Sequence, residues 1–137
     1  MKLRINRLEL LSGLNKVSKA VNAKTPLLAL TGIKFTLSDN QLELIGSDSD
    51  LSIRVVIEKE KNNKQIMEVE EIGSIVINEK IICEIIRKVD SEMVEIYVID
   101  NLAKIKSDKS ILRPIPCVVE RDTALIYVPF EEAGFAF

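Results

Sequence analysis

Two stretches of the chain share the same order of apolar and polar positions, 72 residues apart. Positions 5–17 read INRLELLSGLNKV, and positions 77–89 read INEKIICEIIRKV. In each copy a short alternating run precedes an Asn, and apolar residues then recur at the spacing of a helix. Asn favours the position before a helix, because its side chain accepts a hydrogen bond from an otherwise unpaired backbone N–H. Each copy therefore predicts a strand, an Asn cap and an amphipathic helix.

Alternating apolar and polar residues follow both predicted helices, which is typical of half-buried strands. The segments after the first helix are GIKFTLS, QLELIG and LSIRVVIE, and those after the second are MVEIYVI and LAKIKS. In both copies an Asp-Asn pair joins the first two segments, and such pairs tolerate the backbone angles of tight turns. KEKNNK at 59–64 predicts an exposed loop, and QIMEVEEIG predicts a further strand. The predicted fold class is α+β: a duplicated β-α-β-β-β unit with two helices packed on antiparallel sheets.

The polar stretch GSDSD at 46–50 allows two interpretations. Asp48 and Asp50 have the spacing of carboxylates that hold a divalent cation, which would suit a small magnesium-dependent enzyme. The same Gly, Ser and Asp residues suit the turn of a hairpin between two strands. The sequence offers no further carboxylates with a clear place beside this pair, and the turn interpretation is therefore favoured.

Composition narrows the classes of function. The 137 residues are 47% hydrophobic and 29% charged, which is ordinary for one soluble domain. The chain has no His, the usual proton shuttle and a common metal ligand, and this argues against hydrolytic or zinc chemistry. Cys83 and Cys117 have no motif spacing and predict buried, reduced thiols in a cytoplasmic protein. Apolar runs stay well short of the ~20 residues that cross a bilayer, so we expect no membrane segment.

Basic residues gather on the predicted helices, although the formal net charge of the chain is −2. They lie on the side of each helix that is opposite to its apolar side. This basic helix face consists of Asn15, Lys16 and Lys19 on the first helix, Lys24 just past it, and Arg87 and Lys88 on the second. Such a face on an acidic protein attracts a phosphate backbone without reading its sequence. An ordinary solvated helix face is the alternative interpretation.

Three stretches of the doubled unit have a distinctive amino-acid sequence: the opening MKLRINRLELLSGLNKVSKAV, the loop KTPLLALTGIKF and the turn GSDSDLSI. In this order they closely resemble the N-terminal domain of the bacterial sliding clamp, the β subunit of DNA polymerase III. The resemblance runs from Met1 to about Ser110. It implies a ring of repeated domains, in which helices line a central hole for duplex DNA and sheets form the outer rim.

The function that the resemblance implies is that of a sliding clamp, the processivity factor of the replicative polymerase, with no catalysis and no cofactor of its own. The implied partners are double-stranded DNA, DNA polymerase III and the clamp loader. Asn15 and Lys24 match family positions that touch the DNA backbone, whereas Glu79 and Lys80 stand where the family often has a basic residue. The alternative is a clamp-like interaction module that binds clamp subunits or itself through sheet edges, without a DNA role.

The resemblance also suggests domain boundaries. Residues 1–110 are predicted to form the clamp-type domain, with pseudo-repeats at about 1–58 and 66–110, and residues 111–137 a divergent hairpin or tail. A clamp subunit of this family has three such domains, so the chain corresponds to a single-domain or truncated form. We expect the apolar tail to cover one sheet edge, which favours a monomer, or a dimer through the remaining edge, over a ring of six copies.

The turn interpretation of Asp48 and Asp50 is testable. We expect that replacing both residues with Asn leaves DNA binding intact, and that magnesium or manganese stabilises neither form of the protein. Thermal unfolding with and without each ion measures this. A specific ion held by both carboxylates would contradict the interpretation.

Overall fold

The structure, a computed structural model, describes residues 1–21, 32–47, 51–108 and 114–120. The first unit consists of β1 (Lys2–Asn6), α1 (Arg7–Val17), the 3-10 helix η1 (Ser18–Ala20), β2 (Gly32–Leu37), β3 (Gln41–Ser47) and β4 (Ser52–Glu58). The connection to the second unit contains β5 (Glu60–Lys61), β6 (Lys64–Gln65) and β7 (Met67–Glu71). The second unit consists of β8 (Gly73–Asn78), α3 (Glu79–Lys88), β9 (Met93–Ile99), β10 (Leu102–Ser107) and β11 (Ile115–Glu120). The predicted α+β class and the doubled unit are confirmed.

Both helices begin at equivalent Asn residues. Asn6 Oδ1 accepts a hydrogen bond of 3.0 Å from the backbone N–H of Glu9, and Asn78 Oδ1 accepts one of 3.0 Å from that of Ile81. Each Asn is also the last residue of a strand, so a single residue ends the strand and caps the helix. The predicted caps are therefore both present.

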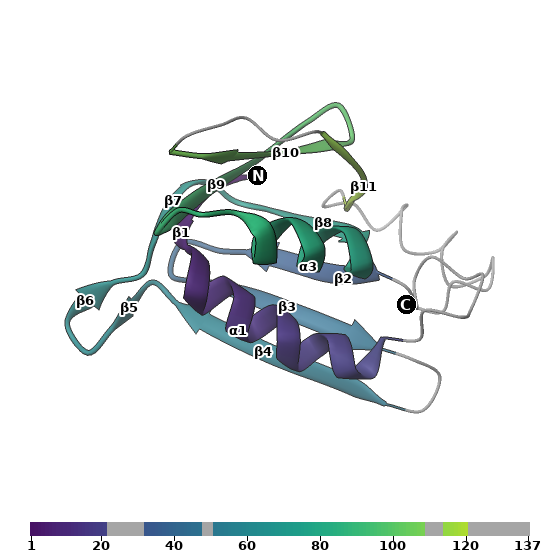
Figure 1. Cartoon of the computed structure of the whole chain (residues 1–137), viewed down its shortest axis with the longest axis horizontal. Coiled ribbons are helices and arrows are strands. Elements are labelled where there is room, and N and C mark those ends of the chain that lie inside the picture. Colours follow the sequence, from purple (N-terminus) through teal and green to yellow (C-terminus); the bar gives the residue numbers. More distant parts are fainter. Residues whose placement is uncertain (22–31, 48–50, 109–113, 121–137) are drawn as a thin grey trace.

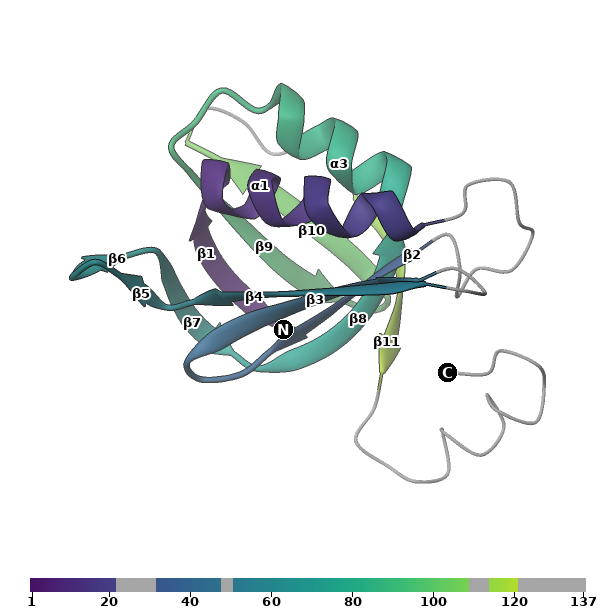
Figure 2. The ribbon, with the colours of Figure 1, turned by 90° about the horizontal axis from the view of Figure 1, so that it is seen from below.

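The two units exchange strands. β1 of the first unit pairs with β9 of the second, and β8 of the second pairs with β2 of the first. These pairings give a nine-stranded sheet in the order β4-β3-β2-β8-β11-β10-β9-β1-β7, with α1 and α3 on one face (Figures 1 and 2). All of its strand pairs are antiparallel. Because each unit contributes a strand to the other half of the sheet, the two halves share one core.

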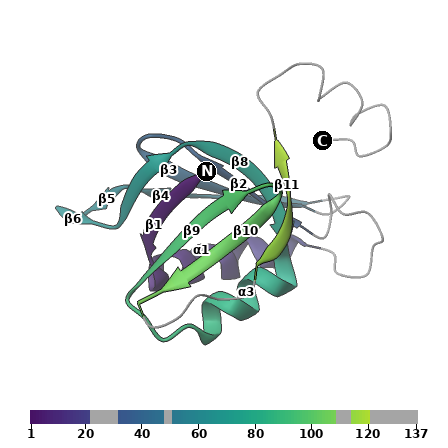
Figure 3. The same cartoon turned by 90° about the horizontal axis from the view of Figure 1, so that it is seen from above.

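The last strand of the second unit crosses between the two halves of the sheet. Its first two residues pair with β10, and the stretch from Cys117 to Glu120 pairs with β8 (Figure 3). In the first unit, two separate strands take the place of this crossing strand. β4 pairs with β3, and β7, which follows the β5–β6 hairpin, pairs with β1. Residues 115–120, which fall in the predicted C-terminal hairpin or tail at 111–137, pair within the sheet. Residues 121–137 lie outside the described part of the chain.

Asn and Asp residues in the left-handed backbone conformation form two of the tight turns. The segment 59–64, predicted as an exposed loop, contains the β5–β6 hairpin, whose turn residues Asn62 and Asn63 have φ angles of 54° and 63°. Asp100 and Asn101 form the turn between β9 and β10, with φ angles of 50° and 64°. Two-residue hairpin turns of type I′ require positive φ at both positions, which Asn and Asp tolerate better than most residues.

The core lies between the helices and the sheet. Leu10, Leu14 and Val17 of α1 have no exposed surface, and Ile82 and Ile86 of α3 are at most 1% exposed. Complete burial of each such side chain stabilises the fold by about 1.5–3 kcal/mol. These are the residues that helical periodicity places on the apolar sides. None of the described helices has the length and apolarity needed to cross a membrane.

At Gly46, the first residue of the GSDSD stretch, the backbone of β3 lies close to the end of α1. A Cβ atom built on Gly46 would lie far inside the contact distance of the Val17 carbonyl oxygen. A backbone carbonyl at the end of a packed helix cannot rotate away as a side chain can. The absence of a side chain at position 46 therefore sets how close α1 lies to the sheet.

Replacing Gly46 with Ala should destabilise the protein by about 2–3 kcal/mol, because the helix end must move away from β3. Urea unfolding measures the change as a lower midpoint at constant slope. Gly13→Ala is the matched control. A Cβ there would meet only side-chain ends, Leu44 Cδ1 at 3.0 Å and Ile57 Cδ1 at 3.2 Å. Ala also favours the helix by up to about 1 kcal/mol, so the net change should stay below about 1 kcal/mol. Equal stability of Gly46→Ala and the unsubstituted protein would contradict this account.

Candidate nucleic-acid interface

The two helices lie side by side and run in opposite directions (Figure 1). Arg7, at the start of α1, donates hydrogen bonds to carbonyl oxygens at and beyond the end of α3, at 3.2 Å from Nη1 to Ile86 and 3.1 Å from Nε to Ser91. At the other end of α1, the Ser18 hydroxyl lies 3.2 Å from Cys83 Sγ in α3. These contacts hold the helices as one antiparallel pair, and Arg7 is engaged within it.

Antiparallel helices separate the basic helix face into two clusters. Lys16 lies in the last turn of α1, and Arg87 and Lys88 lie in the last turn of α3. Because the end of α3 lies beside the start of α1, the two clusters are at opposite ends of the helix layer. The sequence repeat predicts equivalent positions on the two helices, but only the tertiary structure shows that these positions are far apart.

The first cluster borders a shallow groove on the exposed side of α1. Asn15, Lys16 and Lys19 are all exposed, and the groove has a volume of about 380 Å³. Its lining residues are Leu8, Leu11, Ser12, Asn15, Lys16 and Lys19. Leu8, with 64% of its surface exposed, was missed from the sequence. The helical spacing that selects Ser12 and Lys16 reaches Leu8 one turn earlier, so the signal was present in the periodicity.

The second cluster is partly neutralised by an acidic neighbour. Arg87 and Lys88 are exposed, and Lys88 Nζ donates a hydrogen bond of 2.7 Å to Glu84 Oε1, one turn earlier in α3. The hydrogen bond and charge of Lys88 lower the pKa of the Glu84 carboxyl below its usual range. Within the described part of the chain, Lys16 and Lys19 form no such pair. The first cluster therefore presents the less compensated positive charge.

Some of the predicted residues fall outside the described chain. Lys24 lies in 22–31, and Asp48 and Asp50 lie in 48–50. The strands that flank GSDSD do pair, and the hydroxyl groups of Ser47 and Ser52 lie 2.6 Å apart across β3 and β4. Among the described residues, no three His, Cys, Asp or Glu side chains group as metal ligands would.

The basic residues in the last turns also have a structural role. The carbonyl groups at a helix C-terminus carry partial negative charge, which a nearby cation stabilises by about 0.3–1 kcal/mol. Lys16, Arg87 and Lys88 all occupy such positions. This stabilisation does not depend on where the two helices lie relative to each other, whereas in this fold both basic last turns are exposed on the same helix layer. The arrangement is therefore compatible with binding an extended polyanion as well as with stabilising the helices.

The two cysteines belong to the core. Cys83 and Cys117 are buried and form no disulfide, as the sequence predicts. Burial raises the pKa of both thiols, and the hydrogen bond between Ser18 and Cys83 offsets this only in part for Cys83. A thiol with a raised pKa carries little of the reactive thiolate at neutral pH, so neither residue is a candidate nucleophile.

The sequence and the fold of this chain are both similar to those of bacterial sliding clamps. Residues 1–115 match the family described as DNA polymerase III beta subunit, N-terminal domain. The beta sliding clamp of Bacillus subtilis is 40% identical over 111 residues, which is 80% of this chain and 29% of that protein. The beta sliding clamp of Halalkalibacterium halodurans is 39% identical over 108 residues, covering 78% of this chain and 28% of that protein. The crystal structure of the Bacillus subtilis DNA polymerase sliding clamp aligns with a TM-score of 0.82 at 37% identity, over 86% of this chain and 31% of that one.

Proposed function

The chain belongs to the family of the DNA polymerase III beta subunit, N-terminal domain, and on this premise we propose that it is a clamp domain that binds duplex DNA non-specifically through its basic helix face. It would do so as part of a processivity factor for the replicative polymerase, with DNA polymerase III and the clamp loader as partners. The domain itself would perform no catalysis. The observation that carries the proposal is the concentration of positive charge on the helix layer of an acidic chain.

The charge on the helix layer is opposite in sign to that of the chain. The formal net charge of the chain is −2. The basic residues of α1, η1 and α3 are Arg7, Lys16, Lys19, Lys80, Arg87 and Lys88, against the acidic Glu9, Glu79 and Glu84. Each phosphate that a lysine or arginine neutralises releases condensed counterions, and this drives non-specific binding to DNA. A locally basic layer can therefore bind DNA although the remaining surface repels it.

The spacing of the two clusters suits a duplex. Lys16 follows Arg7 by nine residues, and Arg7 contacts the end of α3. At about 1.5 Å per residue, the clusters are separated by roughly 14 Å along the helix direction. The major groove of B-DNA is about 12 Å wide, so the clusters could contact phosphates on its two sides. Contacts of this kind position the protein on DNA without reading base sequence.

The length of the chain limits what one copy does alone. It spans about three tenths of each curated relative that it matches. Encircling DNA would therefore require more than this one domain. The alternative function is a clamp-like module that binds clamp subunits or itself through sheet edges and has no DNA role. DNA affinity separates the two proposals, because only the first requires the basic helix face.

Duplex DNA should bind weakly, with a Kd of about 10⁻⁴ to 10⁻⁶ M, because one domain makes few phosphate contacts. Lys16→Ala should reduce the slope of log K against log salt by about one, equally for unrelated duplex sequences. Fluorescence anisotropy between about 50 and 200 mM salt measures both quantities. Lys106→Ala, on strand β10, is the matched control and should leave the slope unchanged. Binding that is insensitive to salt or strongly sequence-selective would contradict the proposal.

Glu84→Gln should strengthen DNA binding, because it removes the carboxylate that is hydrogen-bonded to Lys88. The gain should be largest at low salt and should be smaller between Lys88→Ala and the Glu84→Gln/Lys88→Ala double variant, because Lys88 is then absent from both. Anisotropy titrations of the single and double variants measure this dependence. An equal gain with and without Lys88 would show that the pair is not the cause.

A further inference from the structure

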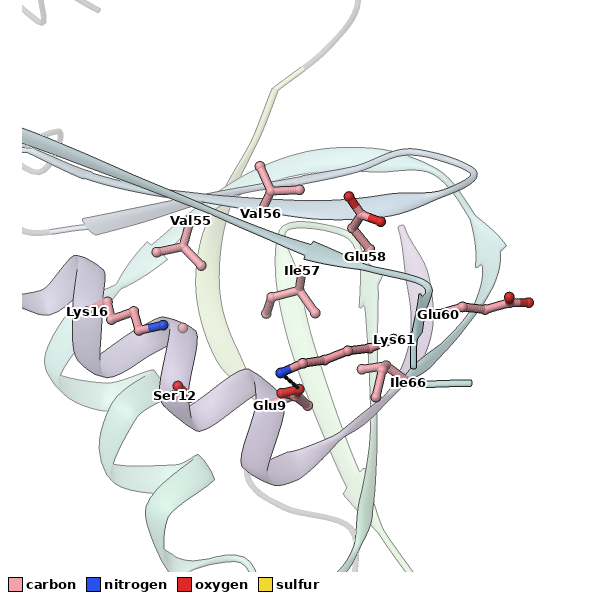
Figure 4. Close-up of a pocket in the computed structure, with 11 residues that line it drawn as sticks. Glu9, Ser12, Lys16, Val55, Val56, Ile57, Glu58, Glu60, Lys61 and Ile66 are labelled. Carbon is pink, nitrogen blue, oxygen red and sulfur yellow. Dashed lines mark hydrogen bonds and ion pairs between the residues drawn. The ribbon is translucent and has the colours of Figure 1, made fainter. Parts of the chain in front are cut away.

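A cleft of about 240 Å³ lies between α1 and β4. One wall of the cleft is apolar, since Val55 and Ile57 of β4 point toward α1 (Figure 4). Gly13 of α1 faces both side chains, and a Cβ atom built on it would lie 3.2 Å from Ile57 Cδ1 and 3.4 Å from Val55 Cγ1. Ile66, which is buried just before β7, also lines the cleft. The cleft therefore offers an apolar surface where the helix meets the edge of the sheet.

An ion pair closes one end of this cleft. Lys61 Nζ of the β5–β6 hairpin donates a hydrogen bond of 3.1 Å to Glu9 Oε1 in the first turn of α1 (Figure 4). The carboxylate of Glu9 is thus already matched by a cation. Glu58 and Glu60 also belong to the lining, but their side chains point away from α1 (Figure 4). None of these three carboxylates directs an unpaired charge into the cleft.

The other end of the cleft carries an unpaired cation. Ser12 and Lys16 lie one turn apart on α1, and both line the cleft. Figure 4 shows the Lys16 side chain extending along α1 toward the Glu9–Lys61 end. Lys16 is exposed and forms no ion pair within the described part of the chain. An ammonium group and a hydroxyl group are both hydrogen-bond donors, so the polar end of the cleft is complementary to an anion.

We propose that this cleft binds a small monocarboxylic acid whose apolar body is about the size of one ring. The carboxylate lies between the Lys16 amine and the Ser12 hydroxyl, and the apolar body covers Val55 and Ile57. Pockets for drug-sized molecules have volumes of about 300–1,000 Å³, so a cleft of about 240 Å³ suits a smaller ligand.

Both parts of the ligand are required by the chemistry of the cleft. An inorganic anion would match Lys16 but leave the apolar wall in contact with water, which burial by a ring avoids. An uncharged apolar molecule would cover the wall but leave the ammonium group without a partner. A carboxylate joined to an apolar body does both, and the charge and the wall therefore specify the same class of molecule.

The proposed ligand goes beyond the DNA role, although Lys16 belongs to the basic helix face as well. A carboxylate bound to Lys16 would reduce the positive charge of that face by one. The ligand site does not depend on DNA binding, and its test contains no DNA. Failure of either proposal is therefore measured separately from the other.

Titration of the ¹⁵N-labelled full chain with 3-phenylpropionate tests the site by the chemical shifts of backbone amides. The shifts should saturate with a Kd of about 0.1–5 mM, which is the range for a ligand of about eleven non-hydrogen atoms. The largest shifts should fall at residues 12–16 and 55–57. The alcohol 3-phenylpropan-1-ol lacks the carboxylate and should bind roughly three- to tenfold more weakly. Acetate lacks the ring and should bind at least about tenfold more weakly.

Variants of Lys16 separate its charge from its apolar stem. Lys16→Met should weaken binding of 3-phenylpropionate roughly three- to tenfold and leave binding of the alcohol unchanged. Lys16→Glu should reverse the preference, so that 3-phenylpropan-1-amine binds more tightly than 3-phenylpropionate. Lys19→Met is the matched control, because Lys19 is exposed nearby but does not line the cleft, and it should leave both affinities unchanged.

The same spectra show whether each variant is folded, since a folded variant keeps the dispersed amide signals of the unsubstituted chain. Equal affinity for the acid and the alcohol, or unchanged affinity of Lys16→Met for 3-phenylpropionate, would overturn the proposal. Shifts that do not saturate by about 20 mM, or that are largest outside the cleft, would overturn it as well.

Discussion

The close contact between β3 at Gly46 and the end of α1 at Val17 is the constraint on which the rest of the arrangement depends. It allows the helix to lie low over the first half of the sheet, with Gly13 facing Leu44 and Ile57. A helix this close to the sheet buries Leu10, Leu14 and Val17 completely. The residues on its opposite side then face solvent. The basic helix face and the apolar core are therefore two consequences of the same packing. A larger residue at position 46 would disturb both at once.

Strand exchange between the units extends this constraint to the whole domain. Because β1 pairs with β9 and β8 pairs with β2, neither unit has a complete sheet without the other. The helices must then lie antiparallel on the shared face, and Arg7 joins the start of α1 to the end of α3. This geometry places the C-terminal turns of the two helices at opposite ends of the layer. A duplicated sequence thus yields two separate basic clusters instead of one concentrated patch.

The helix layer and the strand edges of the domain differ in their chemistry. The helix layer is basic and rigid, which suits a polyanion that is bound without base recognition. The strand edges carry the unpaired backbone groups, and these suit another protein chain. β7 protects its edge with carboxylates and an irregular register, whereas β4 presents a regular edge with alternating apolar and charged side chains. The surface proposed to bind DNA is thus separate from the strand edges.

Local features of this protein were readable from the sequence, because they depend on neighbouring residues. The strands, the Asn6 and Asn78 caps, the helix faces and the Asp-Asn turns all follow from periodicity and side-chain chemistry within a few positions. The resemblance to the clamp family was likewise carried by short stretches in a fixed order. The hairpin within KEKNNK was missed, since an exposed charged segment has no apolar alternation to indicate strands.

Long-range features were decided only by the tertiary structure. The sequence does not state that β11 joins β10 to β8, and the segment was therefore assigned to a separate tail. It does not show that Lys16 and Lys88 lie at opposite ends of one layer, or that Glu84 holds Lys88. Nor does it show which strands end the sheet. Each of these depends on the pairing of residues that are distant in the chain, and a repeat of 72 residues fixes the order of elements but leaves their partners open.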